Sequence, residues 1–303
     1  AATTAVTFGT TNVGGTTTYA WSNNTTSIGL GASGTGNINS FFGINTGSSP
    51  VIATITVTPT YTSGLVSCVG STKQFTIQVN NVAAGSIGSN QTICYNGDPA
   101  AFTNTLDGTG VGTISYIWQS STDNVTYTAI LGETTSTYDP PSGLTNTTYY
   151  RRITVSTLNG VACQSSPSSS IIVTVNSVTA GSIGTSQTIC YNGDPAAFTS
   201  VAAGSAPVGS VISYRWQSSL DNITYSDIAG ATLATYDAPS GLTNSTYYRR
   251  ITVSTLNTVV CESNPTTAIL VTVQSVPTAG SIAADQTICY SGDPAAFTSV
   301  ANG

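Results

Sequence analysis

Charged residues are scarce in this sequence, and two residue types are missing altogether. Only 6% of the 303 residues are charged, and the chain contains no His and no Met. Without His, neither a Ser-His-Asp triad nor a Cys-His pair can form within the chain. The twelve acidic residues are scattered, and those that recur lie in turn-like segments, so a carboxylate pair for glycoside hydrolysis is not expected. The sequence therefore predicts no active site and no enzyme.

Positive charge is especially sparse. The net charge is −6, and the six cations form no cluster that could release counterions from a nucleic acid. The same sparsity disfavours an anionic membrane surface, and no apolar run reaches the ~20 residues that span a bilayer. We therefore predict neither nucleic-acid binding nor membrane insertion. The cations are Lys73, Arg151, Arg152, Arg215, Arg249 and Arg250.

The sequence also lacks the motifs that hold metals and cofactors. It has no C-x-x-C motif, which removes the usual zinc arrangements. Asp107-Gly108-Thr109-Gly110 resembles part of a calcium loop, but the aligned segment Ala202-Ala203-Gly204-Ser205 has no acid. A structural turn is the favoured interpretation, and no metal or cofactor is predicted.

A repeated block dominates what the chain does contain. Residues 92–103 recur letter for letter at 188–199, and again at 287–298 with Ser291 in place of Asn. The cysteines inside the three blocks, Cys94, Cys190 and Cys289, are 96 and 99 residues apart. A period that long corresponds to a whole small domain rather than to a solenoid turn.

This period divides the chain into three domain-sized units and part of a fourth. The connecting segments are only a few residues long, which favours an elongated, semi-rigid array over freely jointed domains. No basic stretch followed by an apolar one opens the chain, so we interpret it as an interior piece of a longer secreted protein. The predicted domains are 1–81 (without its N-terminal strand), 82–177, 178–276 and 277–303 (the start of a further repeat).

Period-two alternation, as in residues 52–57, predicts half-buried strands, and no stretch shows helical periodicity. About seven short strands in each unit, with a tryptophan on a central strand, predict an all-β chain of immunoglobulin-like sandwiches. A closed barrel is the alternative. The expected core aromatic residues are Tyr19, Trp21, Tyr116, Trp118, Tyr214 and Trp216.

One later strand carries two conflicting signals. Leu144 lies six residues before Tyr150, which suggests a tyrosine corner, whereas alternation with Ile153 and Val155 places Tyr149 inward. The two arginines that follow are expected to point outward and cover neighbouring tyrosines. A sugar- or anion-binding patch is the alternative interpretation of the Tyr-Tyr-Arg-Arg motif.

The six cysteines predict disulfides and therefore secretion. Pairing within each unit would join Cys94 to Cys163 and Cys190 to Cys261, closing loops worth about 4 kcal/mol each. The rival pattern joins neighbouring units. It consists of Cys68 with Cys94, Cys163 with Cys190, and Cys261 with Cys289.

The order of these motifs resembles a known repeat type. Ala-Gly-Ser-Ile-Gly, Gln-Thr-Ile-Cys, Tyr-x-Trp-Gln-Ser-Ser and Gly-Leu-Thr-Asn-x-Thr-Tyr-Tyr-Arg-Arg resemble the Ig-like repeats of very large Bacteroidota surface proteins. The first unit, with Trp21-Ser22-Asn23-Asn24 and Thr54-Ile55-Thr56-Val57-Thr58-Pro59, is similar to their PKD-like domains. The resemblance implies export by the gliding-associated type IX system and extracellular display on the bacterial cell surface, as an adhesin or filament.

Three functional hypotheses follow. The first is a structural stalk or filament segment of a secreted adhesin, in which the repeats contact their neighbours in the same chain. Strand donation between copies would extend it into a filament. The second is a binding module in which exposed Tyr and Trp side chains hold a surface polysaccharide. The third is an accessory region of a secreted enzyme.

Overall fold

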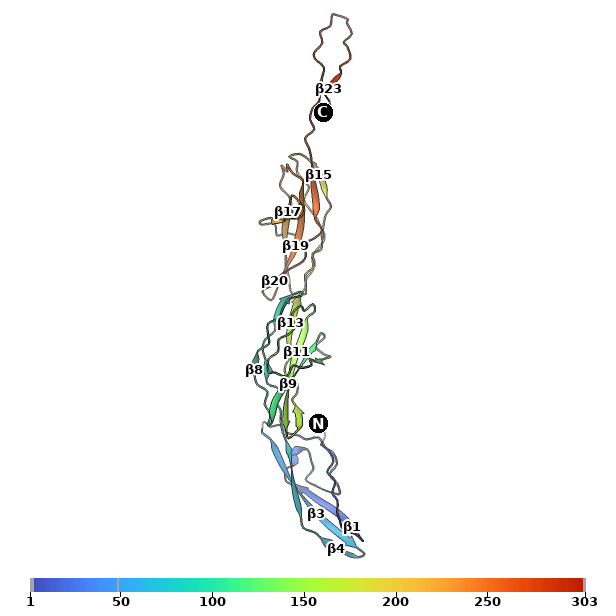
Figure 1. Ribbon diagram of the computed structural model, residues 1–303, viewed down its shortest axis with the longest axis vertical. Helices are drawn as coiled ribbons and strands as arrows, with labels where there is room; N and C mark the ends of the chain where they lie inside the picture. Colours follow the sequence, from blue (N-terminus) through green and yellow to red (C-terminus); the bar gives the residue numbers. More distant parts are fainter. Residues whose placement is uncertain (1–2, 48, 302–303) are drawn as a thin grey trace. The chain divides into compact units, whose positions relative to one another are not determined.

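A computed structural model describes residues 3–47 and 49–301. It contains β-strands and one short 3-10 helix, η1 (Thr26–Ile28), and no α-helix occurs within the described ranges. The prediction of an all-β chain is confirmed. The chain divides into two compact units, Ala1–Val175 and Asn176–Gly303. Figure 1 shows the strands of each sheet lying side by side.

The first sheet has the strand order β2-β1-β3-β4, with β5 also pairing with β3. Alternation in β3 turns Ala53, Ile55 and Val57 inward, and all three are buried. Trp21 lies opposite Val57 in the register and is partly buried against the same core. The strands are β1 (Thr16–Asn23), β2 (Ser33–Thr35), β3 (Val51–Ser63), β4 (Val66–Val69) and β5 (Lys73–Val79).

The second sandwich has one large layer and one small one. The large layer has the order β10-β9-β11-β13-β7, with β12 also on β11, and the small one is β6 with β8. Isolated bridges from Phe102 to Tyr138 and from Gly97 to Leu144 extend the small layer. The strands are β6 (Ser86–Ile87), β7 (Gln91–Cys94), β8 (Asn104–Leu106), β9 (Thr113–Ser121), β10 (Thr128–Ala129), β11 (Thr148–Leu158), β12 (Val161–Gln164) and β13 (Ile171–Asn176).

The third sandwich repeats this arrangement. Its large layer has the order β15-β21-β19-β17-β18, with β20 on β19, and its small layer is β14 with β16. β15 runs parallel to β21, whereas β17, β19 and β21 are antiparallel neighbours. The strands are β14 (Ser182–Ile183), β15 (Gln187–Cys190), β16 (Ser200–Ala202), β17 (Val211–Ser219), β18 (Ser226–Asp227), β19 (Thr246–Leu256), β20 (Val259–Glu262) and β21 (Ile269–Gln274).

An aromatic cluster fills the space between the layers in the second and third sandwiches. Trp216 is fully buried, with its ring centroid 5.9 Å from that of Phe198 and 5.5 Å from that of Tyr236. Its indole N–H donates to the Leu233 carbonyl at 2.9 Å, so burial leaves no polar atom unpaired. Trp118 has the same arrangement with Phe102 and Tyr138.

Residues 277–301 carry the repeated block without a large layer over it. β22 (Ser281–Ile282) pairs with β23 (Ser299–Ala301). The Gln286 side chain bonds to the backbone of Ala295 as Gln187 does to Ala196. Phe297 is 60% exposed here, whereas its equivalent Phe198 is 2% exposed.

This contrast provides a test of the aromatic core with an internal control. Phe198→Ala should destabilise the third sandwich by about 3–5 kcal/mol, because it removes a buried ring and leaves a cavity. Phe297→Ala changes the same residue of the same block but should cost less than about 0.5 kcal/mol, since that ring is exposed. Urea unfolding combined with peptide-resolved hydrogen exchange measures both. Equal losses in the two variants would contradict this account of the core.

Candidate functional site

Most of the aromatic residues singled out in the sequence lie inside the sandwiches. Trp118 and Trp216 are fully buried, and Tyr116 is 7% exposed. Tyr214 is half-buried under a guanidinium, with the Arg250 head group 4.5 Å from its ring centroid. Tyr19 and Trp21 are partly buried against the first core. The indoles of the second and third sandwiches are therefore unavailable for holding a polysaccharide.

The two arginines of each Tyr-Tyr-Arg-Arg motif face opposite sides of the sheet. Tyr150 and Arg152 point inward, and the Arg152 side chain is fully buried. Tyr149 and Arg151 alternate with them and lie on the outer face. Of the two tyrosines, Tyr150 is therefore the inward one, and the expectation that Arg152 points outward is wrong. The misleading cue was the buried hydroxyl pair Thr154 and Ser156, which alternation by hydrophobicity cannot recognise.

Backbone carbonyls surround the buried guanidinium. Arg250 on β19 donates to the Ala234 carbonyl at 2.7 Å and to the Ala202 carbonyl at 3.0 Å. It also donates to the Ser200 hydroxyl at 2.9 Å. These acceptors belong to the opposite layer and to the segment that leads to Tyr236, so one side chain joins the two layers. Arg152 makes the equivalent contacts with Ser136, Leu106 and Asn104.

Burial lowers the pKa of both Arg152 and Arg250 below the ordinary value for arginine. Arginine stays protonated at neutral pH even so. No described acid forms an ion pair with either one. Carbonyl dipoles and the faces of Tyr116 and Tyr214 compensate the charge, and the negative charge of Asp107 also favours the protonated form of Arg152. Each of these arginines lies two residues after the inward tyrosine, where antibody domains place the second cysteine of their inter-sheet disulfide.

The outer arginines are held differently. Arg249 stacks on Tyr225, with 3.6 Å from the guanidinium carbon to the ring centroid. Its Nε donates to the Gln217 side-chain oxygen at 2.7 Å. Arg151 repeats this geometry on Tyr127 at 3.7 Å and on Gln119 at 2.7 Å. The two copies place the same planar cation on the same face of the same strand pair.

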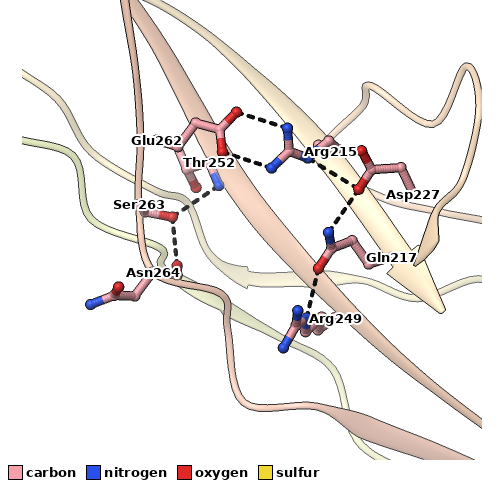
Figure 2. A network of polar contacts seen from close by, with 8 residues as sticks. All are labelled: Arg215, Gln217, Asp227, Arg249, Thr252, Glu262, Ser263 and Asn264. Atoms are coloured by element: carbon pink, nitrogen blue, oxygen red, sulfur yellow. Dashed lines mark hydrogen bonds and ion pairs between the residues drawn. The ribbon is translucent and has the colours of Figure 1, made fainter. Parts of the chain in front are cut away.

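The third sandwich extends this arrangement into a charged network (Figure 2). Gln217 donates to Asp227 at 2.7 Å, and Asp227 lies 3.3 Å from Arg215. Arg215 also makes a two-point contact with Glu262, at 2.8 and 2.6 Å. Exposed ion pairs of this kind stabilise a fold by less than about 1 kcal/mol, so the network mainly fixes side-chain positions.

Asp221 lies in the turn that follows β17, and hydrogen bonds within that turn fix its carboxylate. Asp221 accepts hydrogen bonds from the backbone of Ile223 and Thr224 and from the Ser219 hydroxyl, all at 2.8 Å. These bonds favour the ionised form and lower the pKa of Asp221 to about 2. The same bonds to Asp123 in the second sandwich lower its pKa below the usual range.

A shallow cavity of about 320 Å³ lies beside this turn. Five of its seven lining residues carry a hydroxyl group; the lining comprises Ser218, Ser219, Leu220, Asp221, Thr224, Ser226 and Thr246. The Asp221 carboxylate already accepts three hydrogen bonds within the turn, so its role is to stabilise the turn. No group of three or more His, Cys, Asp or Glu residues that could hold a metal occurs in the described part of the chain. Asp107, weighed above for calcium, accepts a bond from Asn104.

The predicted disulfide pairs are absent from the structure. Cys163 and Cys190 carry free thiols, as do Cys68 and Cys289, whereas Cys94 and Cys261 are disulfide-bonded. Neither the pairing within units nor the rival pairing between neighbours fits this pattern.

Strand register explains why cysteines of one sandwich cannot pair. In the third sandwich Cys190 lies beside Gln274, and Cys261 lies beside Ser254. Because Thr246 pairs with Val271, the two cysteines lie at opposite ends of the sheet. About eleven residues of strand separate them, roughly 35 Å at about 3.3 Å per residue. A disulfide needs Cα atoms within about 7 Å.

The sheets and cores define a tandem array of Ig-like β-sandwiches. The chain belongs to the family described as "Domain of unknown function (DUF8696)", whose model matches residues 83–177 and 179–275. A search of curated proteins found no match. Within the described residues, no helix has the length and apolar character to cross a bilayer.

Solved structures of Ig-domain arrays also resemble this chain, all at low identity. The three N-terminal domains of the bacteriophage RB49 outer capsid protein Hoc match at 12% identity and a TM-score of 0.41, covering 89% of this chain and 92% of that one. Titin domains A168–A170 match at 11% and 0.32, covering 86% and 90%. The four N-terminal Ig domains of Dscam1 isoform 8.4 match at 10% and 0.29, covering 84% and 65%.

The buried guanidinium can be tested against its exposed neighbour. Arg250→Met should destabilise the third sandwich by about 3 kcal/mol or more, because it leaves several buried carbonyls without a donor. Arg249→Met removes the same charge one residue away and should cost less than about 1 kcal/mol. Urea unfolding of both variants makes the comparison. A cost for Arg250→Met no greater than for Arg249→Met would show that the guanidinium does not join the layers.

The Asp221 turn should respond to acid. Since its folded pKa lies below the ordinary value of 3.8, its stabilising effect is complete above about pH 4 and is lost as pH falls toward 2. A carboxyl-carbon NMR titration should give a midpoint near 2. In Ser219→Ala, which removes one donor, the midpoint should move upward. Midpoints near 4 in both proteins would contradict the hydrogen-bonded turn.

Proposed function

We propose that this chain is a structural segment, a stalk or filament section, of a secreted bacterial cell-surface adhesin. The observation that carries the proposal is the repetition of a self-contained sandwich, each with its own tryptophan-centred core and its own buried arginine. A disulfide in the chain agrees with an oxidising, extracellular location. The motif resemblance to Bacteroidota surface repeats supports export by the type IX system.

The proposed mechanism is mechanical. In a tandem array, each domain resists unfolding through its own core, and the number of domains sets the reach of the protein. Antiparallel strands of nine and eleven residues, β17 and β19, must shear or unzip many backbone hydrogen bonds before a domain opens. On this proposal the partners are neighbouring repeats and other copies in a filament. Catalysis forms no part of the proposal.

Single-molecule pulling tests the mechanical role. With the disulfide-bonded Cys94 and Cys261 reduced, the second and third sandwiches should unfold in separate force peaks, each lengthening the chain by roughly 30 nm at about 3.5 Å per residue. Phe198→Ala should lower the force of one peak and leave the other unchanged, because each core is independent. A single shared peak, or gradual lengthening without peaks, would rule out independent load-bearing domains. Protease shaving of intact cells of the source organism checks surface display.

A further inference from the structure

We propose that the outer arginine of each sandwich, Arg151 or Arg249, is a binding site for the carboxylate of an acidic polysaccharide. This inference goes beyond the structural role proposed above, because a mechanical stalk needs no ligand. It rests on the geometry of the Arg–Tyr–Gln arrangement, which the second and third sandwiches share.

The guanidinium plane is fixed before any ligand arrives. Tyr225 supports one face of Arg249, and Gln217 accepts the bond from Nε. Gln217 is itself held by Asp227 through its amide nitrogen (Figure 2). Little side-chain freedom remains to be lost on binding, which is the condition under which one charged contact contributes most to affinity.

The terminal nitrogens of these arginines remain free to bind. Within the described part of the chain, the Nη atoms of Arg151 and Arg249 have no hydrogen-bond partner and form no ion pair, and they are not among the buried unpaired atoms. They are therefore open to solvent. A planar fork of N–H groups matches a carboxylate through two parallel hydrogen bonds.

Nearby charge distinguishes the two copies. Around Arg249, the positive Arg215 is matched by the two acids Asp227 and Glu262. The corresponding positions of the second sandwich are Ile117, Ala129 and Gln164, which are uncharged. No acid of the network therefore competes for Arg151, so it should bind a carboxylate more tightly than Arg249.

The surroundings favour a saccharide over other anions. A nucleic acid needs clustered positive charge, whereas this face offers one unpaired arginine in a chain of net charge −6. A polysaccharide with one carboxylate on each sugar ring can engage a single arginine through a two-point contact, without the clustered positive charge that a nucleic acid needs.

Titration calorimetry of the whole 303-residue chain with polygalacturonate tests the site, with methyl-esterified polygalacturonate as the uncharged probe. We expect binding of the acid form and at least tenfold weaker binding of the ester. Arg151→Gln combined with Arg249→Gln should weaken binding at least tenfold. Of the single variants, Arg151→Gln should have the larger effect. Thermal unfolding of the variants should change only slightly, since both side chains are half-buried on the outer face and each should contribute less than about 1 kcal/mol to stability.

Lys73→Gln is the matched control, because it removes one exposed positive charge from the first sheet and should change affinity less than twofold. Several results would overturn the proposal. They are absence of binding, equal binding of the ester, an equal loss in Lys73→Gln, and undiminished binding by the double variant. Tighter binding of poly-glutamate than of polygalacturonate would assign the site to an acidic protein instead.

Discussion

A buried guanidinium that bonds to backbone carbonyls is the interaction on which each of the two repeated sandwiches depends. A charge taken out of water is costly unless donors and acceptors meet with good geometry. The terminal nitrogens of Arg152 and Arg250 meet that condition by donating to carbonyls of the opposite layer, and each guanidinium faces a tyrosine ring. The Nε atom of each, in contrast, is buried without a hydrogen-bond partner among the described residues. The acceptors have fixed positions, so the guanidinium sets how the two layers lie against each other.

Two groups fill the space between the layers of each repeated sandwich: the aromatic cluster and the buried guanidinium. The indole of Trp216 packs with Phe198 and Tyr236 at one level, and Arg250 on the neighbouring strand joins the layers beside it. Cysteines are not needed for this task, since those of one sandwich lie at opposite ends of its sheet. Alternation along β11 and β19 then leaves the adjacent arginine outside, where a tyrosine and a glutamine hold it.

Much of the fold was predictable from local patterns. The tryptophan strands, the repeated block and the period near 97 residues identify tandem all-β domains, because strand alternation and domain length are both local properties of a sequence. Local sequence patterns could not show that Arg152 is buried while the adjacent Arg151 lies on the outer face. Thr154, Ser156 and Arg152 form a buried polar side of β11, and a hydrophobicity pattern assigns such residues to solvent. The cysteine positions depend on strand register, which sequence spacing does not encode.

NMR of the arginine side chains tests the central claim most directly. In a protein labelled with nitrogen-15 at arginine, Arg152 and Arg250 should show separate, slowly exchanging Hη signals at neutral pH, because several carbonyls hold each guanidinium out of water. Arg151 and Arg249, with only Nε bonded, should show averaged and rapidly exchanging signals. Rapid exchange and free rotation at Arg152 and Arg250 would contradict a guanidinium that joins the two layers.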